Sequence, residues 1–375
     1  MPAYTYRVKI ESTNVTDATV APLRWTNGRN TLADSLGKTW GSVDFFKAAL
    51  EDIYGFTPLS VITFGQDITV EVYDSATSSW IMAVAGKITD LASDRNTITV
   101  TFVDRAIWTI TRLAPVSLPT GNQTDLSAKI ADVIDAYITV TDNTTGGPYE
   151  VHWTINSSSN LGDWAATVIS DIPSGLGYFN DKLVLEDREA TPTSDLTLTA
   201  DMVFDDYNIQ RGIGDICNSV TITYHNNGTY SETNATSVTA IGTRHVAVTS
   251  YLKNAADAEV LARTFLGRFA PEGWPIVSFR TSAAQINKTG KWVAENMFPN
   301  LVLDSTSIDA IPFGGLMYLE QVEHQLSPDR WGLILTVSDA TYSNLPQTWA
   351  DVTAALQWGQ VTGTLTWTDL IYQDI

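Results

Sequence analysis

Apolar and polar residues alternate with a period of two in several stretches of residues 1–115. Because successive side chains of a strand point to opposite faces of a sheet, this alternation predicts half-buried β-strands. The clearest stretches run from Tyr4 to Ile10, from Ile68 to Val72 and from Ile98 to Phe102. One helix is predicted between them, with Ser42 as its cap, Gly55 after its end, and a helically spaced apolar face of Phe46, Ala49, Leu50, Ile53 and Tyr54. We expect residues 1–115 to form a first antiparallel β-barrel domain, or a sandwich, that carries this helix.

The pattern changes near residue 116, where apolar residues recur at helical spacing. One predicted helix is capped by Thr124 or Asp125, and its apolar face is Leu126, Ile130, Val133, Ile134 and Tyr137. A second predicted helix follows Asn160 and contains Trp164, Val168 and Ile169. Strands are predicted between Tyr178 and Glu186. We therefore expect residues 116–203 to form an inserted α+β domain.

Alternation returns after residue 204, with Val220, Ile222 and Tyr224 on one face of a strand that leads into a turn at residues 226–228. A helix is predicted at residues 254–269 from apolar residues at helical spacing, with an acid in its first turn and arginines nearer its carboxyl end. We expect residues 204–345 to form a second β-barrel domain and residues 346–375 to form a short C-terminal extension. The predicted fold class is thus mainly β, with an α+β insert.

A segment of the first domain recurs in the second at a constant spacing of 235 residues. Residues 82–104 align with residues 317–339 without a gap, and the identical pairs are Met82 and Met317, Leu91 and Leu326, Asp94 and Asp329, Arg95 and Arg330, Thr101 and Thr336, and Asp104 and Asp339. Each copy predicts a strand, a tight turn at Asp-Arg, and a returning strand that ends in Asp. The match fits two related β-domains in one chain, and it also fits two hairpins that resemble each other by chance. The Asp-Arg residues fit polar turn positions better than ion pairs at subunit contacts.

Acidic residues outnumber basic ones by 42 to 22, which gives a net charge of −20. Such a chain repels nucleic acid as a whole, although it could guide DNA without adhering to it. The single cysteine, Cys217, excludes an intramolecular disulfide and a cysteine-based zinc site. No apolar stretch approaches the ~18 residues that a membrane span needs, and the N-terminus has no signal-peptide pattern. We expect neither membrane insertion nor signal-directed secretion.

Three groups of segments carry a resemblance to a known family. The first group is Asn27-Gly28-Arg29, Thr57-Pro58-Leu59, Gly65 to Ile68, Gly86 to Asp90, and Val100 to Asp104. The second is Asn218 to Thr223, Ser237, Ile241 to Arg244, and Asn254 to Ala258, and the third runs from Val322 through Trp331 to Leu335. In these segments the sequence resembles the baseplate hub, or tail-associated, proteins of long-tailed bacteriophages, in particular the hub-type minor tail proteins.

The resemblance implies a structural protein rather than an enzyme, without cofactor or metal, located at the tail tip of the virion after assembly in the host cytoplasm. It implies a homotrimer in which two tube-like barrels per chain form a pseudo-sixfold ring that continues the tail tube. It also implies contacts with the distal tail protein, the C-terminus of the tape-measure protein, and central fibre or tip proteins, and the transient passage of DNA. Longer family members carry a C-terminal fibre or peptidoglycan-cleaving domain, so we expect cell-wall hydrolysis to belong to another protein.

The C-terminal extension contains one short pattern twice. Trp349 and Asp351 follow Thr348 in the same way as Trp367 and Asp369 follow Thr366. Each Thr can cap a short helix that has a Trp in its first turn and an acid three residues after the cap. A short helix cannot bury a large aromatic side chain by itself. We expect the two elements either to dock on a neighbouring subunit or partner through Trp349 and Trp367, or to fold back on their own domain.

Few residues suggest chemistry. The histidines His152, His225, His245 and His324 are too scattered for a metal motif, and we expect them at surfaces or interfaces. Residues 212–214 form a Gly-Ile-Gly turn that lacks the context of a dinucleotide site. The alternative function is a carbohydrate-binding or glycoside-hydrolysing receptor-recognition protein, because 12 tryptophans and many carboxylates occur in a β-rich chain. The tryptophans are dispersed along the sequence, which favours core and interface roles.

Overall fold

The structure is a computed structural model that describes most of the chain up to residue 339. The described residues are 4–29, 36–112, 121–124, 126–144, 150–153, 161–170, 175–188, 193–203, 208–210, 216–269, 276–307 and 315–339. They form β-strands more often than helices, which confirms the mainly β class. No helix within these ranges is long and apolar enough to cross a membrane.

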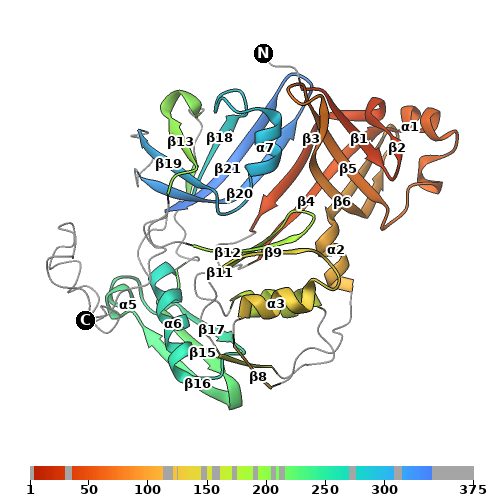
Figure 1. The fold of residues 1–375 in the computed structure, drawn as a ribbon. Coiled ribbons are helices and arrows are strands. Elements are labelled where there is room, and N and C mark those ends of the chain that lie inside the picture. Colours follow the sequence, from red (N-terminus) through yellow and green to blue (C-terminus); the bar gives the residue numbers. More distant parts are fainter. Residues whose placement is uncertain are drawn as a thin grey trace.

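One large mixed sheet organises the molecule (Figure 1), with the strand order β14-β18-β21-β20-β3-β4-β7-β6-β5-β1-β2. Its N-terminal strands are β1 Tyr6–Ile10, β2 Thr13–Asn14, β3 Thr19–Gly28, β4 Leu36–Phe46, β5 Asp67–Asp74, β6 Ser79–Ser93 and β7 Thr97–Asp104. Its C-terminal strands are β14 Asn208–Gln210, β18 Ile276–Ser282, β20 Leu316–Leu326 and β21 Trp331–Asp339. Strands β3 and β20 pair antiparallel, from Gly28 opposite Gln321 to Leu23 opposite Leu326. This pairing places the N-terminal and C-terminal strands next to each other in one sheet.

The alternating stretches form strands because their apolar faces meet in a common core. In β7, the buried residues Ile98, Val100 and Phe102 alternate with half-buried threonines. The same core contains Leu333 and Leu335 of β21. Strand β13 Leu196–Thr199 pairs parallel with β19 Val302–Ser307, which pairs with β20 at the margin of the sheet. The N-terminal and C-terminal strands therefore stabilise each other through shared burial.

Two short helices lie against the N-terminal strands. Helix α1, Lys47–Tyr54, ends at Gly55, whose φ of 69° is the left-handed conformation expected of glycine after a helix. The predicted cap Ser42 is wrong, because Ser42 lies within β4 opposite Thr101 and the helix begins five residues later at Lys47. Helix α7, Gly290–Asn296, packs on β5 and β6 and lies in the part of the predicted second β-barrel domain after residue 269, for which the sequence predicted no helix. The side chain of Thr289 caps it by accepting a bond from the Trp292 amide.

A second core lies below the sheet in the view of Figure 1. It is built on the helices α2 Arg105–Arg112, α3 Leu126–Ile134 and α4 Leu161–Ser170, with the strands β8 Gly121–Thr124, β9 Val140–Asn143, β10 Glu150–Trp153, β11 Gly175–Phe179 and β12 Leu183–Asp187. Strand β11 runs parallel to the start of β4, and β12 runs parallel to β9. This region has the α+β character that the sequence predicts.

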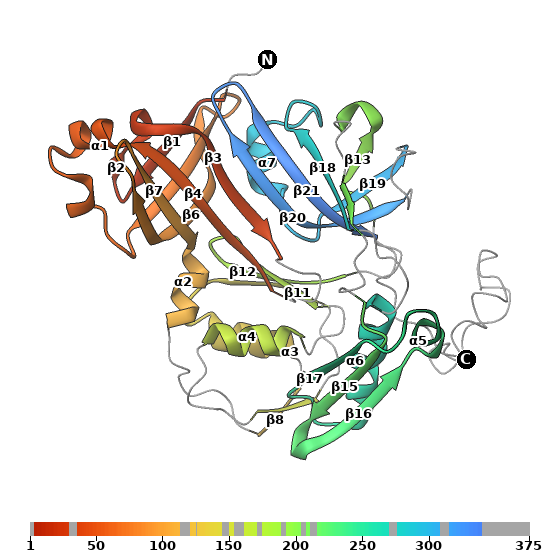
Figure 2. The same cartoon turned by 180° about the vertical axis from the view of Figure 1, so that it is seen from behind.

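A three-stranded sheet with the order β16-β15-β17 adds to the second core (Figure 2). Its strands are β15 Ser219–Tyr224, β16 Gly228–Thr233 and β17 His245–Thr249, and its helices are α5 Ala235–Ile241 and α6 Ala255–Phe269. Buried residues of β15 and α6 belong to the same cluster as those of α3 and α4. Residues 216–266, which the sequence assigned to the second barrel domain, thus pack with the predicted insert.

The path of the main sheet is open. Among the described residues, β14 pairs only with β18 and β2 pairs only with β1, so the strands do not close into a barrel within one chain. The N-terminal part of the path is nevertheless sharply curved and folds over its own core (Figures 1 and 2). A single copy is therefore a continuous curved sheet with an α+β region attached below it.

Candidate assembly interface

The two segments of the sequence repeat both form antiparallel hairpins in the main sheet. Strands β6 and β7 make the first hairpin, and β20 and β21 make the second. Each has one bulge in its outgoing strand, between Ile88 and Asp90 in the first and between Leu319 and Gln321 in the second. The strands β3 and β4 separate the two hairpins in the sheet. The hairpins thus share a layout, and they flank a common pair of strands.

The gapless alignment is correct for the returning strands only. Just beyond the bulges, Thr101 pairs with Asp90 and Thr336 pairs with Gln321, so the returning strands keep the offset of 235 (336 − 101). The outgoing strands have an offset of 231 (321 − 90), because the second hairpin continues for six pairs beyond its bulge and the first for four. Met82 and Met317 are therefore not equivalent: Met82 pairs with Glu71, whereas Met317 pairs with Asp339.

The two Asp-Arg turns differ in detail. Asp94 is the first residue of its loop and accepts bonds from the amides of Asn96 and Thr97, at 2.7 and 2.6 Å. Asp329 is the third residue of its loop and accepts a bond from the hydroxyl of Ser327 at 2.7 Å. These hydrogen bonds lower the pKa of both carboxyl groups. The structure places Asp94, Arg95, Asp329 and Arg330 in exposed turns of separate hairpins and does not bring the two turns together.

Asp104, the last residue of the first hairpin, joins the sheet to the α+β region. Its carboxylate is buried and accepts bonds from the amide of Ala106, in the first turn of α2, and from the amide of Asp181, in the turn between β11 and β12, both at 2.7 Å. Burial raises the pKa of Asp104 to about 6, although these backbone bonds partly oppose the rise. Asp339 ends the second hairpin opposite Met317.

Glu320 is the bulge residue of the second hairpin, and its buried carboxylate holds three segments together. It accepts bonds from Arg29 just after β3, from Arg188 just after β12 at 2.8 Å, and from Ser338 of β21. Arg188 also lies over the ring of Tyr318, 4.5 Å from its centre. Burial alone would raise the pKa of Glu320, but the guanidinium groups of Arg188 and Arg29 hold it well below its usual range.

A buried aromatic group lies along the same strand. The ring of His324 is stacked on Trp25, with 4.7 Å between the ring centres, and its Nδ1 accepts a bond from Trp331 Nε1 at 3.2 Å. Since Nδ1 is an acceptor, the neutral ring carries its proton on Nε2. Burial lowers the pKa of His324 to about 3, although a bond with the Met297 carbonyl partly opposes the shift. The expectation of a surface or interface position is wrong for His324, which is buried in phase with Val322 and Leu326.

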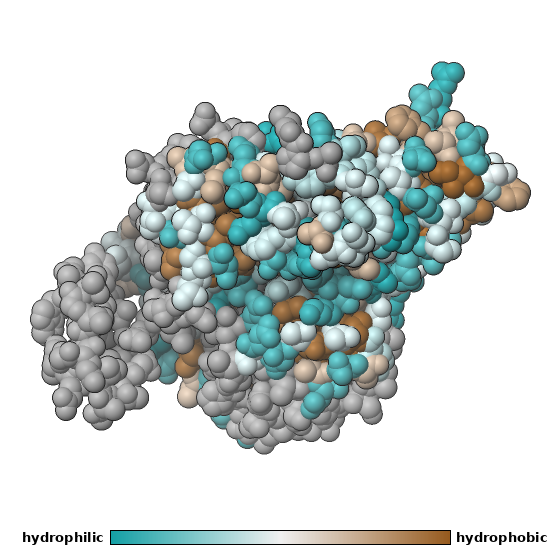
Figure 3. Space-filling view, turned by 45° about the horizontal axis from the view of Figure 1, so that its top comes forward, coloured by the Kyte–Doolittle hydropathy of each residue, from teal (hydrophilic) through white to brown (hydrophobic). Residues whose placement is uncertain are grey.

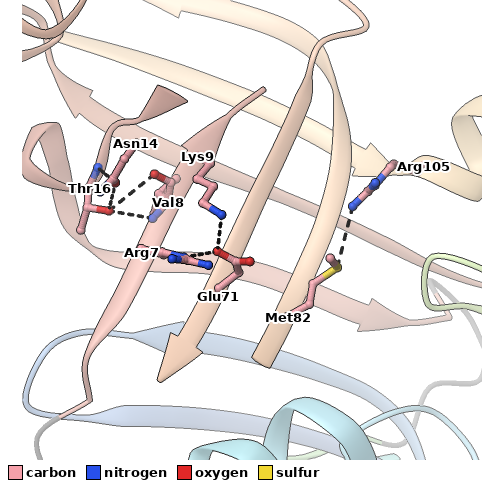
Figure 4. A network of polar contacts seen from close by, with 8 residues as sticks. All are labelled: Arg7, Val8, Lys9, Asn14, Thr16, Glu71, Met82 and Arg105. Carbon is pink, nitrogen blue, oxygen red and sulfur yellow. Dashed lines mark hydrogen bonds and ion pairs between the residues drawn. The ribbon is translucent and has the colours of Figure 1, made fainter. Parts of the chain in front are cut away.

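Charged pairs cover the outer strands of the N-terminal part (Figure 4). Glu71 of β5 pairs with Arg7 and with Lys9, 3.0 Å away, both on β1, and these bases hold the pKa of Glu71 below its usual value despite partial burial. Arg105 at the start of α2 lies 3.2 Å from Asp181 and 3.8 Å from the sulfur of Met82. The contact between Arg105 and Met82 adds to the link that Asp104 makes between the sheet and the α+β region.

An exposed apolar patch lies at the end of the molecule where α1 is found. We define the α1 patch as Phe46, Phe56, Leu59 and Phe64, of which Phe56 and Phe64 are 69% and 64% exposed. Figure 3 keeps the left-to-right order of Figure 1 and shows hydrophobic side chains at the right-hand end, where α1 lies. Large aromatic side chains gathered in one exposed segment are typical of a surface that another molecule covers.

The described residues offer little for catalysis or sugar binding. No group of three or more His, Cys, Asp or Glu residues in the described ranges is arranged to hold a metal ion. Trp25, Trp331 and Trp164 are buried and fill cores, so they provide no open stacking platform for a sugar. These three tryptophans therefore give no support to the alternative function. Trp349, Asp351, Trp367 and Asp369, the predicted docking residues, lie outside the described residues.

Comparison with solved structures identifies the fold. A tail protein from Neisseria meningitidis MC58 aligns with a TM-score of 0.61 and 14% identity over 91% of this chain and 99% of that one. The 43 kDa tail protein of prophage MuSo2 from Shewanella oneidensis aligns with a TM-score of 0.58 and 15% identity over 91% and 98% of the two chains. The chain has the fold of phage tail proteins. Prophage tail protein gp18 from Listeria monocytogenes EGD-e also aligns, with a TM-score of 0.51 and 10% identity over 89% of this chain and 94% of that one.

This likeness confirms, at the level of the fold, the resemblance to tail-associated proteins that the sequence indicates. No model of a known protein family matches the chain, and no curated protein matches its sequence. The tail-protein fold is therefore conserved here in backbone arrangement at identities of 15% and below.

Proposed function

We propose that the chain is a structural hub protein of a phage tail tip or baseplate, located in the virion. The observation that carries the proposal is the match to tail proteins over about nine-tenths of the chain, with nearly the whole of the first two matched structures covered. The match includes the main sheet and the α+β region together, so it concerns the whole architecture and not one common motif. The buried charges and histidine described above serve packing, which is consistent with a structural role.

The proposed assembly is a ring of three copies that continues the tail tube. The two hairpins support it, since each chain supplies two similar β-units on either side of β3 and β4. Three copies then present six similar units around one axis, which would match a sixfold tube to a threefold tip. In this proposal the two hairpins belong to β-units in the sequence regions 1–115 and 204–345, residues 216–266 of the second region pack with the insert 116–203, and 346–375 serves docking.

The proposed partners are the distal tail protein on one side, central fibre or tip proteins on the other, and the C-terminus of the tape-measure protein inside. DNA would pass through the ring without specific binding. The net charge of −20 supports this part, because carboxylates along a passage keep phosphates from adsorbing to its wall. The proposal assigns no catalytic activity, cofactor or membrane insertion to this chain.

Native mass spectrometry of the full chain tests the assembly. The expected species has three times the mass of the 41.0 kDa chain and dissociates into single copies at high collision energy. A protein that remains a single copy at all concentrations tested would contradict the proposed ring. A glycan array run on the same sample distinguishes the hub protein from the alternative function. Specific and saturable sugar binding would favour a receptor-recognition protein.

A further inference from the structure

The α1 patch is presented by a loop that is fixed in place. Helix α1 ends where the Gly55 amide bonds to the Glu51 carbonyl at 2.8 Å, and the loop rejoins the sheet where the Gly65 amide bonds to the Ile88 carbonyl at 2.8 Å. Gln66 closes the loop from within, because its side chain accepts a bond from the Thr63 amide at 2.9 Å and donates one to the Val61 carbonyl at 3.1 Å. The loop therefore has a defined conformation in which each side chain has a fixed direction.

Within this loop, some apolar residues are buried and others are not. Pro58 and Ile62 point into the protein, and Ile62 has no exposed surface. Phe56, Leu59 and Phe64 alternate with them and remain exposed. Phe46 adds to the surface from the end of β4, opposite Thr97. Since the loop already has its own anchors, the exposed aromatic residues are not needed to hold it, and they are positioned in advance for another surface.

The distribution of charged residues along the chain indicates which kind of surface covers the α1 patch. Residues 55–66 contain no charged residue, although 17% of the whole chain is charged. Residues 352–368 of the C-terminal extension also contain none. In a chain with a net charge of −20, a contact between copies avoids like-charge repulsion where both of its sides are neutral. Residues 55–66, which carry most of the α1 patch, and residues 352–368 of the C-terminal extension both satisfy that condition.

The C-terminal extension also has the matching side chains. Trp349, Trp358 and Trp367 recur every nine residues, so three of the 12 tryptophans of the chain lie in its last 30 residues. The patch offers three phenylalanines and a leucine, and aromatic anchors on one side commonly pair with aromatic or aliphatic pockets on the other. We propose that residues 346–375 of one copy dock on the α1 patch of a neighbouring copy through these tryptophans.

The position of the end of β21 favours a neighbour over the same copy. Asp339 ends β21 opposite Met317 of β20, which pairs with β19 on its other edge, and both ribbon views place this part of the sheet away from α1 (Figures 1 and 2). An extension that leaves one side of a copy and binds the opposite side of the next is a heterologous contact, which closes into a ring when the rotation permits. This inference rests on the proposed ring, because it needs a second copy at the α1 end.

Photocrosslinking in the full chain tests the contact. The photoreactive residue p-benzoylphenylalanine replaces Phe56, and equal amounts of ¹⁴N-labelled and ¹⁵N-labelled chain are mixed, dissociated, reassembled and irradiated. We expect adducts between residue 56 and a peptide from residues 340–375, with half of them joining a light and a heavy chain. The same reagent at exposed Thr249 on β17 is the matched control, and no adduct with residues 340–375 is expected there.

A second variant tests the anchors. Trp349→Ala together with Trp367→Ala should lower the yield of the mixed adduct about tenfold, since large aromatic anchors carry most of the energy of such contacts. Adducts confined to one isotope, adducts with another part of the chain, or no adduct at all overturn the proposed contact. A native mass of three copies without the mixed adduct overturns this contact alone, whereas a single-copy mass overturns the proposed ring as well.

Discussion

The two hairpins of the main sheet have the same layout and different contents. Each is an antiparallel pair with one bulge in the outgoing strand. The bulge residue of the first hairpin is Thr89, whose hydroxyl bonds to the carbonyl of its neighbour Thr101 at 3.3 Å. The bulge residue of the second is Glu320, which binds two arginines from distant segments. One backbone device therefore serves a local role in one hairpin and a long-range role in the other.

The position in the sheet explains this difference. The second hairpin lies against β3 and close to the end of β12, so its bulge is covered by Arg29 and Arg188 and is cut off from water. The first hairpin leaves Thr89 only partly buried, and its long-range contact comes at its end, through Asp104. Backbone geometry is shared by the hairpins, while the side chains at equivalent positions follow the degree of burial.

The largest expected effect is the loss of the Glu320 charge. Glu320→Gln leaves two buried guanidinium groups without their carboxylate, and we expect it to lower the free energy of unfolding by about 3–5 kcal/mol. Glu323→Gln on the same strand is the matched control, because Glu323 is only partly buried, and it should cost about 0.5 kcal/mol or less. Urea unfolding of both variants measures the difference. Equal losses in the two variants would show that the contacts of Glu320 with the two arginines add no particular stability to the second hairpin.

The second-largest expected effect is a loss of stability at low pH that originates at His324 in the second hairpin. The pKa of His324 is about 3 in the folded protein and ~6.5 in the unfolded chain. The neutral ring therefore contributes fully to the free energy of unfolding above pH ~6.5, and this contribution falls as the pH decreases towards 3. We expect the titration of His324 to lower the free energy of unfolding by about 2 kcal/mol between pH 7 and pH 5. His324→Gln should remove this loss, while His245→Gln at an exposed position should leave it in place. Unfolding curves across this pH range measure both, and an unchanged slope in His324→Gln would refute the assignment.

The first hairpin should respond to acid in the opposite direction. Because burial raises the pKa of Asp104 to about 6, the folded protein binds a proton between pH 6 and 3.8 that the unfolded chain does not. Acidification from pH 7 to pH 5 should therefore add about 1 kcal/mol through this group. In a His324→Gln background, which removes the larger opposing loss, Asp104→Asn should abolish the gain, and a double variant whose stability still rises on acidification would point to another group. His324→Gln, with Asp104 intact, is expected to become more stable at pH 5.

The smallest effect separates the two turns. Asp94→Ala removes the acceptor of two backbone amides, whereas Asp329→Ala removes the acceptor of one hydroxyl. We expect the thermal midpoint to fall more for Asp94→Ala than for Asp329→Ala, and both changes to be small because the turns are exposed. Differential scanning calorimetry at pH 7 provides the comparison. A larger fall for Asp329→Ala would reverse the order of the two turns.

Much of the fold could be predicted from local pattern. The alternation of Ile98, Val100 and Phe102 identifies β7, and the apolar face of residues 254–269 identifies α6 to within one residue. Periodicity succeeds here because each element buries one face against a core. It fails for α7, a helix of seven residues, since so short an element shows less than two turns of the period.

The site could be predicted less well, because its contacts are between distant parts of the sequence. Arg29 and Glu320 are 291 positions apart, and no local pattern connects them. The bulges are equally hidden, since a gapless alignment of residues 82–104 with 317–339 cannot show that the second hairpin is longer. The alternation of His324 with Val322 and Leu326 indicates a core position, whereas its polar side chain by itself indicates the surface.

Electron microscopy of the assembled particle tests the proposed hub most directly. Class averages of tail tips that contain this chain should show a ring on the tail axis with three copies and six similar lobes around an open passage. Copies found singly at the periphery of the tip, or a ring on the axis without sixfold-like lobes, would contradict the assignment of two related β-units to each chain.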